Sequence, residues 1–298
     1  MKNKYKNTAI IYNPASGFGD NKNKKEQILN TAKKFGWDGE LYETSKNVSS
    51  ATLAKKIIDQ QYKKIIICGG DGTIMEALAE ILKSDIQLGI IPLGSGNLLA
   101  QNLNLDLDIR KALETAFKGK VQRIDIGKAN GTLFTVMAGI GFDAEIMKKA
   151  NRKMKSKYGF FAYIVTGLKH LGRRSGKYKI TIDGGKGKIV KAKSIVVANM
   201  GKIQGGIEAV PSTHSQNGIF CIGVIQATSV SAWLNLVANA ITGDINKSPH
   251  YQLLKGKRIE IESVRGAKPY QCDGNHFPPT KKLSVTIYPQ ILQVMVKK

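Results

Sequence analysis

KIIICGGDGTIMEALAEIL, at residues 64–82, joins a strand to a helix through a turn with three glycines. The apolar run at 65–67 predicts a buried strand, and the apolar spacing that follows predicts a helix over 74–82. Glycines let the backbone approach a ligand closely, and the first turn of a helix offers unpaired N–H groups and a positive dipole end. A phosphate seat is therefore predicted at the turn, which consists of Gly69, Gly70, Asp71, Gly72 and Thr73.

Asp71 needs its own explanation, because a carboxylate repels phosphate. It fits if a Mg²⁺ ion lies between the carboxylate and the phosphates, or if Asp71 polarises a hydroxyl nucleophile. A structural alternative is a capping box, in which Thr73 and Glu76 close the start of the helix. The capping box would explain these two residues but not the glycines.

Two further strand ends carry the same kind of turn. The strand at 88–91 is followed by PLGSGN at 92–97 and by a short helix from about Leu98, and the strand at 9–12 is followed by NPASG at 13–17. The carboxyl ends of parallel strands meet at one edge of a sheet, where ligands of open α/β sheets bind. We therefore expect the three turns to lie together. Neither a Walker-type GxxxxGK[ST] loop nor a complete dinucleotide fingerprint occurs in the sequence.

The first 125 residues alternate short apolar strands with helices, which predicts an α/β domain whose parallel sheet is covered on both faces. Its strands are predicted at 9–12, 40–43, 64–68 and 88–91, and its helices at 23–35, 52–60 and 74–82. After Asp125 the sequence predicts a mostly antiparallel β domain, with strands at 178–183, 188–199, 219–226, 257–264, 283–288 and 291–296 and helices at 159–171 and 232–241. The predicted domains are 1–125 and 126–298, with the last strand a candidate to return toward the first domain.

The 298 residues include 46 Lys and Arg against 22 Asp and Glu, a net charge of +24. This charge favours polyanionic partners, although it is also compatible with a general solubility trait. No helix-turn-helix, zinc finger or RNP-like strand is recognisable, so we expect no specific nucleic-acid partner. Three cysteines without CxxC spacing suit a reducing cytosol. No stretch approaches the ~18 apolar residues of a membrane span, so we expect a cytoplasmic protein.

Residues 148–179 contain eleven Lys and Arg and no acidic residue, and they enclose the apolar stretch 159–168. One interpretation is a core helix with solvated basic flanks. The other is a surface that holds the protein on anionic lipid, since each basic residue near such a surface contributes ~1 kcal/mol. We expect peripheral association with an anionic membrane.

Together these motifs resemble the diacylglycerol kinase catalytic-domain family, which includes bacterial lipid kinases and sphingosine and ceramide kinases. The resemblance extends over nearly the whole chain, from NPASG at 13–17 through GGDGT and GSGN to the pair Asp273-Gly274. It implies a Rossmann-like or phosphofructokinase-like nucleotide-binding domain, a β-sandwich domain, and a nucleotide cleft between them. The implied reaction transfers the γ-phosphate of ATP, with Mg²⁺, to a hydroxyl of diacylglycerol or a related lipid.

The resemblance also implies roles for individual residues. ATP would lie over residues 69–73, and its further contacts would be Asn13, Ser16, Gly17, Thr44, Gly94, Ser95, Gly96 and Asn97. Asp71 would be the metal ligand and, with Asp273 and Asn275, would belong to the catalytic set, while Asp143 falls near the acceptor head group.

Three positions depart from the family pattern. The catalytic motif usually reads Asp-Gly-Glu, with the Glu as expected general base, but here the third residue is Asn275, whose amide cannot accept a proton. Asn217-Gly218 replaces an Asp-Gly pair that holds a structural Mg²⁺ in bacterial members, and Met75 stands where Asn is common. The chain could be a slow kinase, a kinase with Asp71 or Asp273 as base, or a nucleotide- or lipid-binding relative without activity. An NAD kinase is less favoured, because it would share only GGDGT. The sequence names neither the lipid nor the oligomeric state.

Overall fold

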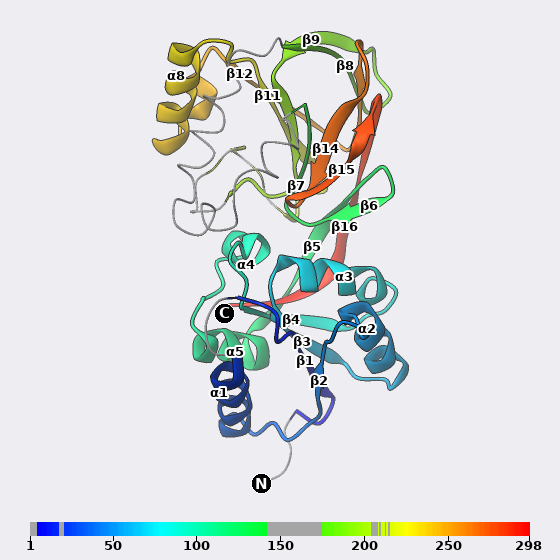
Figure 1. The fold of residues 1–298 in the computed structure, drawn as a ribbon, viewed down its shortest axis with the longest axis vertical. Coiled ribbons are helices and arrows are strands. Elements are labelled where there is room, and N and C mark those ends of the chain that lie inside the picture. Colours follow the sequence, from blue (N-terminus) through cyan, green and yellow to red (C-terminus); the bar gives the residue numbers. More distant parts are fainter. Residues whose placement is uncertain are drawn as a thin grey trace. The chain divides into compact units, whose positions relative to one another are not determined.

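The computed structural model describes residues 5–17, 21–141, 175–203, 208, 210–211, 213 and 215–298. The chain divides into two compact units (Figure 1). Unit 1 comprises residues 1–124 and 290–298, and unit 2 comprises residues 125–289. None of the helices in the described part of the chain is both long and apolar enough to cross a membrane.

Unit 1 is built on a parallel sheet with the strand order β2-β1-β3-β4. These strands are Thr8–Tyr12 (β1), Leu41–Glu43 (β2), Lys64–Gly69 (β3) and Gln87–Pro92 (β4). The end of β16 (Lys282–Val296) adds a further parallel pairing, Val294 with Leu88. β1 is buried along its whole length, as expected for a central strand of Ala, Ile and Tyr covered on both faces.

Helices cover both faces of this sheet (Figure 1). They are Asn21–Lys34 (α1), Ser50–Asp59 (α2), Asp71–Ile81 (α3), Leu98–Asn102 (α4) and Ile109–Lys118 (α5). Side chains of α1 and α5, among them Ile28 and Leu113, form one core with the even-numbered side chains of the central strands, such as Ile10 and Ile66. The predicted α/β class is confirmed, with α5 as an additional helix that the periodicity did not predict.

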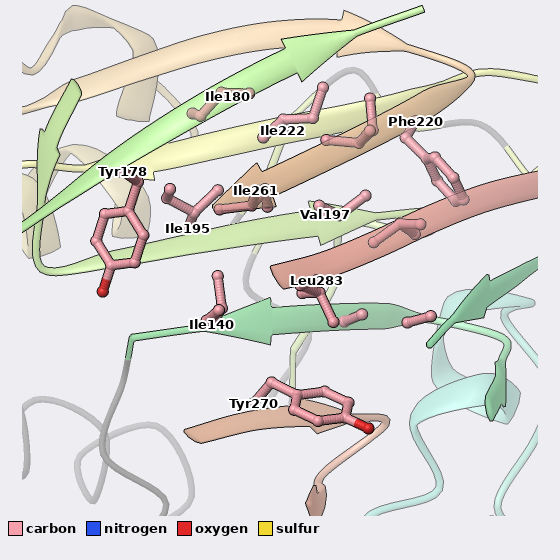
Figure 2. Packing of buried hydrophobic residues seen from close by; sticks show 14 of the residues in the cluster. Ile140, Tyr178, Ile180, Ile195, Val197, Phe220, Ile222, Ile261, Tyr270 and Leu283 are labelled. Atoms are coloured by element: carbon pink, nitrogen blue, oxygen red, sulfur yellow. The ribbon is translucent and has the colours of Figure 1, made fainter. Parts of the chain in front are cut away.

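Unit 2 contains two antiparallel β-sheets. One sheet has the order β12-β11-β10-β7-β14-β15, formed by Tyr251–Gly256, Phe220–Ile225, Ser194–Ala198, Met137–Ile140, Lys268–Cys272 and Asn275–Thr280. The other consists of β5 (Lys120–Ala129), β6 (Thr132–Phe134), β8 (Gly176–Ile182), β9 (Lys188–Ala192), β13 (Arg258–Ser263) and the first part of β16. Inward side chains of both sheets form one core, including Ile195, Phe220 and Ile261 (Figure 2). The predicted antiparallel sandwich is confirmed.

One helix, Val230–Ile241 (α8), packs on the outer face of unit 2 together with the short 3₁₀ helix Ile245–Lys247 (η1). Its Trp233 and Leu236 are buried in a small separate cluster with Tyr251 of β12. This helix agrees closely with the prediction at 232–241. The helix predicted at 159–171 lies outside the described residues.

Two strand predictions were wrong in detail. Residues 188–199, predicted as one strand, form β9 and β10, which lie in different sheets and meet at Lys193. The strands predicted at 283–288 and 291–296 are one continuous strand, β16, which bends at Gln290, where φ is 51°.

Candidate functional site

The three predicted turns follow neighbouring strands of unit 1. β1 pairs with β3 in parallel, and β3 pairs with β4 in parallel. The ladder continues into the turns, because Asn13 N–H donates to Cys68 O (3.0 Å) and Leu93 N–H donates to Gly69 O (2.9 Å). Residues 13–17, 69–73 and 94–97 therefore lie together at the carboxyl edge of the sheet, and we call them the loop cluster.

Side chains join the first turn to the second. Asn13 Nδ2 donates to Thr73 Oγ1 at 2.8 Å, and the N–H of Gly70 donates to Ser16 Oγ at 3.3 Å. The Oδ1 atom of Asn13 also accepts from the N–H of Ala15 at 2.9 Å, which fixes the shape of its own turn. Asn13 and Ser16, predicted as ATP contacts, therefore hold the GGDGT turn in place.

The second and third turns touch through glycine backbone. A Cβ atom on Gly94 would lie 2.7 Å from the Cα of Gly70, so only glycine permits this approach. Asn97 stabilises the third turn in a left-handed conformation, with its Oδ1 accepting from Gly94 N–H (2.9 Å) and its Nδ2 donating to Gly94 O (2.7 Å). Ser95 is exposed at the tip of this turn.

Helix α3 begins directly in the loop cluster. Its N-cap is Gly70, which has no side chain to cap the helix. The capping-box alternative is therefore wrong: the hydroxyl of Thr73 accepts from Asn13, and Glu76 Oε2 accepts from the N–H (2.9 Å) and hydroxyl (2.6 Å) of Ser50. The positive end of the α3 dipole lies in the cluster, which suits an anion. The N–H groups of Thr73 and Ile74 donate to Gly70 O, so the N–H of Gly72 is the candidate donor to such an anion.

None of the described residues requires glycine at position 72. It is exposed in the first turn of α3, and a Cβ atom placed on it would meet nothing within 4 Å among the described residues. Alanine is the better helix former, by up to ~1 kcal/mol in a helix interior. A bound group that approaches the backbone at this point would explain the glycine, so the loop cluster fits a phosphate chain.

Asp71 connects α3 to the third turn. Its Oδ1 accepts from the N–H of Leu99 at 3.3 Å, at the start of α4, and its Oδ2 would lie 3.0 Å from a Cβ atom on Gly96. Burial raises the pKa of this carboxyl, whereas backbone N–H groups at residues 97–99 and that of Asp71 itself lower it. One carboxylate beside a phosphate seat suits Mg²⁺ that arrives with a nucleotide, since Mg²⁺ binds one or two carboxylates plus substrate phosphates. Among the described residues, no group of three or more His, Cys, Asp or Glu side chains is placed to hold a metal ion.

Two more residues lie at this edge of the sheet. Thr44, implied by the resemblance, follows β2, is buried and donates its N–H to Tyr12 O at 3.0 Å. Lys24 was missed: a Cβ atom on Gly17 would lie 3.2 Å from its Nζ, so its ammonium group is beside the first turn. The sequence did carry a signal for Lys24. Helix α1 begins NKNKK, which places lysines at the end where the dipole disfavours cations.

Asp273 and Asn275 lie in unit 2, at the two-residue turn between β14 and β15. Asp273 and Gly274 have φ values of 46° and 81°, as in a type I′ hairpin. The Oδ1 of Asp273 accepts from the N–H groups of Val136 and Met137 (both 2.9 Å). Its Oδ2 accepts from the N–H (2.6 Å) and hydroxyl (2.9 Å) of Thr135. Burial raises the pKa of Asp273, and these hydrogen bonds oppose that rise.

Asn275 is exposed at the start of β15 and pairs with Cys272. Of the other departures, Met75 is half-buried in α3, and Asn217 is exposed beside Gly218, whose N–H donates to Asp125 Oδ2 at 2.7 Å. Asp143 lies outside the described residues, as does most of the basic segment 148–179. The predicted residues thus fall into two groups, the loop cluster with Thr44 in unit 1 and the Asp273 turn in unit 2.

Comparison with known proteins agrees with both units. Residues 7–129 match the diacylglycerol kinase catalytic domain, and residues 135–296 match the YegS C-terminal NAD kinase beta sandwich-like domain. A protein of Staphylococcus carnosus named diacylglycerol kinase is 28% identical over 277 residues, which cover 91% of this chain and 89% of that protein. Another of that name, from Bacillus subtilis, is 28% identical over 299 residues, which cover 98% and 97%.

The fold is also shared with a solved structure. The crystal structure of a diacylglycerol kinase from Bacillus anthracis superimposes with a TM-score of 0.81 at 24% sequence identity, over 99% of each chain. Both halves of the sequence and the whole fold therefore lead to the same group of proteins. The chain belongs to the diacylglycerol kinase catalytic-domain family of bacterial lipid kinases.

Proposed function

We propose that the protein is an ATP- and Mg²⁺-dependent lipid kinase that phosphorylates a hydroxyl of diacylglycerol or a related lipid. The observation that carries the proposal is Gly72, whose missing side chain leaves open space among the described residues at the start of α3, beside two further turns of the loop cluster. This arrangement suits a chain of phosphates better than any structural requirement of the fold.

The residues of unit 1 bind and orient the donor. The N–H of Gly72, in the first turn of α3, donates to a phosphate oxygen, and the Lys24 ammonium beside Gly17 offsets part of the phosphate charge. Mg²⁺ supplies further neutralisation of the phosphates when it is bound with ATP. Contacts between the turns hold them in place before the donor binds, so the turns need not rearrange around it. These contacts come from Asn13, Ser16, Asp71, Gly94 and Asn97. Thr44 and Ser95 are the remaining donor contacts of the proposal.

The acceptor is a lipid hydroxyl, as the names of the relatives suggest. The new P–O bond forms to the hydroxyl oxygen as the bond between the β- and γ-phosphates breaks, ADP leaves, and the hydroxyl proton passes to solvent. Phosphoryl transfer depends mainly on positioning and charge stabilisation. An amide at Asn275 therefore slows the reaction without abolishing it.

A second candidate is a nucleotide-binding protein that does not transfer phosphate. Two observations favour it: residue 275 is an amide, and the nearby carboxylate of Asp273 has two oxygens that each accept two hydrogen bonds. A carboxylate engaged in this way is a poor general base. The two candidates differ only in turnover.

The proposal also assigns a role to each domain and a cellular location to the protein. We assign donor binding to residues 1–125 and acceptor binding, with Asp143, to residues 126–298. The net charge of +24 and the three buried cysteines, which form no disulfide, support work in a reducing compartment at the surface of an anionic membrane.

The test is a kinase assay with labelled ATP, Mg²⁺ and phosphatidylglycerol vesicles that contain diacylglycerol, a sphingoid base or an isoprenoid alcohol. We expect label in the organic extract, greatest with diacylglycerol, and loss of label in Gly72→Ala. Association with Mg·ATP but no product from any lipid would favour the second candidate. Production of NADP from NAD in the same assay would show that the protein is an NAD kinase.

A further inference from the structure

Helix α8 of unit 2 carries no charged residue, although one side of it faces solvent. Its sequence, VSAWLNLVANAI, contains no Asp, Glu, Lys or Arg. Solvent-facing helices of globular proteins normally place charged and polar side chains on the outer face. The outer face of α8 therefore has the composition of a binding surface rather than that of an ordinary solvent-exposed helix face.

The apolar residues of α8 form two separate stripes. Trp233 and Leu236 point inward and pack against β11 and β12 through Ile225, Tyr251 and Leu253. A second stripe points outward, with Val230 55%, Leu234 51% and Ile241 60% exposed. The spacing of four and seven residues places these three side chains on one line along the helix. We call them the outer stripe.

Polar side chains without charge border the outer stripe on one side. Ser231 and Asn235 are exposed, and Asn239 Nδ2 donates to the backbone oxygen of Asn235 at 2.8 Å. Asn235 Oδ1 also accepts from the hydroxyl of Ser248 at 2.9 Å, which ties α8 to the segment after η1. Helix α8 therefore presents to solvent an apolar stripe with uncharged polar side chains beside it.

Basic residues are near both ends of α8. Lys247, on η1 directly after the helix, is exposed and forms an ion pair with Asp244 at 2.7 Å. Before the helix, Gln226 Nε2 donates to the backbone oxygen of Lys191, and Lys193 N–H donates to Ile225 O at 2.8 Å. The net charge of +24, together with lysines in the segments before and after α8, complements anionic lipid head groups.

We propose that the outer stripe of α8 inserts into the interface of an anionic lipid bilayer. The inference deepens the proposed function and rests on it, because a lipid kinase must reach a substrate that is dissolved in a membrane. A second copy of the chain is a poorer occupant. Three side chains of this size cannot supply the roughly 800 Å² per partner that a stable protein interface buries. A single helix face is, in contrast, sufficient for reversible binding to a bilayer.

The test measures binding without catalysis. Full-length protein is sedimented with phosphatidylglycerol vesicles and with phosphatidylcholine vesicles, as wild type and as the double variant Leu234→Ser, Ile241→Ser. We expect wild type to bind the anionic vesicles and the double variant to bind them at least tenfold more weakly. The matched control is Val264→Ser, which removes a side chain of similar exposure (53%) in the turn after β13. This control is expected to bind like wild type.

A second measurement reports insertion directly. Since Cys68, Cys221 and Cys272 are all buried, Leu234→Cys offers one exposed thiol on α8 for an environment-sensitive fluorophore. We expect a blue shift with anionic vesicles, and none for the same label on Val264→Cys. Equal binding by wild type and the double variant, an unshifted label, or dissociation of a wild-type dimer by the double substitution would each overturn the inference.

Turnover of a short-chain, water-soluble diacylglycerol separates this inference from the proposed function. The double variant is expected to phosphorylate that substrate as wild type does, because α8 is not part of the donor site. Absence of turnover in wild type would contradict the proposed kinase activity. The vesicle-binding result would still decide whether the outer stripe inserts into the bilayer.

Discussion

The side-chain amide of Asn13 donates a hydrogen bond of 2.8 Å to the hydroxyl of Thr73, 60 residues further along the chain. The bond joins the turn after β1 to the first turn of α3. Thr73 is buried, so the bond is partly protected from water. It joins the NPASG motif to the GGDGT motif through two side chains. The bond gives a reason for a polar residue at both position 13 and position 73.

Removal of this bond should weaken donor binding more than it weakens the fold. A partly buried neutral hydrogen bond contributes about 0.5–1.5 kcal/mol, so Asn13→Ala is expected to lower Mg·ATP affinity about 2–13-fold. Thr73→Val removes the other partner. Both substitutions remove the same hydrogen bond. In calorimetric titrations, the double variant should therefore bind Mg·ATP about as tightly as either single variant. Fully additive losses would show that the two side chains act separately.

Acid should weaken donor binding through Asp71. Burial raises the pKa of its carboxyl, so it takes up a proton at a higher pH than an exposed Asp, whose pKa is 3.8. Since the pKa is higher in the folded than in the unfolded chain, this protonation does not itself favour unfolding. Mg·ATP affinity should therefore fall as the pH is lowered while the protein stays folded.

The matched variant for this pH series is Asp71→Asn, which is neutral at every pH. Its affinity should be reduced at pH 8, and its remaining pH dependence should be that of ATP alone. Identical pH profiles for wild type and Asp71→Asn would contradict a role for the ionised carboxylate.

Asp273 should matter more for stability than its place in a catalytic motif suggests. Asp273→Asn puts an NH₂ group against the N–H donors of residues 135–137 and leaves part of them unsatisfied. We expect the free energy of unfolding to fall by about 2–4 kcal/mol in urea titrations. The exposed neighbour provides the control, since Asn275→Ala should change stability by less than about 0.5 kcal/mol. If Asp273→Asn leaves the free energy of unfolding unchanged, Asp273 has no stabilising role and its role is catalytic alone.

Asn275→Glu restores the residue that the family has at this position. A general base typically contributes about 10²–10⁴-fold to the rate, so the variant should turn over faster than a slow but measurable wild type. Asn275 is exposed, and the melting temperature should stay unchanged. No activity in wild type with activity in the variant would favour the non-transferring candidate. Equal rates would show that the amide does not limit turnover.

The pattern of apolar residues predicted the α/β class of the first half and the β class of the second. It also carried a signal for the two strand boundaries that were predicted wrongly. The inward side chains of β9 are Val190 and Ala192, but those of β10 are Ile195 and Val197. A straight strand cannot bury even and odd positions on one face, so the change of parity marks the break. β16 changes parity in the same way at Gln290, but a local bend allows it to continue as one strand.

The candidate site was predictable where it depends on turns at strand ends. The contact of Gly70 with Gly94 follows from strands that pair in the sheet, and the motifs identified both turns. The bonds of Glu76 to Ser50 and of Asp273 to residues 135–137 were not predictable, because they join segments that only the tertiary fold brings together. The sequence therefore suggested a capping box where Glu76 in fact accepts hydrogen bonds from Ser50, and it did not indicate that Asp273 also holds residues 135–137. The catalytic role of Asp273 stays a prediction.

Gly72 provides the most direct test of the central claim that the loop cluster holds a triphosphate. Gly72→Ala adds one methyl group to open space in the first turn of α3, so the variant should fold with unchanged or slightly higher stability. Calorimetric titration with Mg·ATP should show binding to wild type and at least about tenfold weaker binding to Gly72→Ala, since the methyl group would take the space that the proposal gives to a phosphate oxygen. Equal affinity of the two proteins, or no binding of Mg·ATP by wild type, would contradict the account.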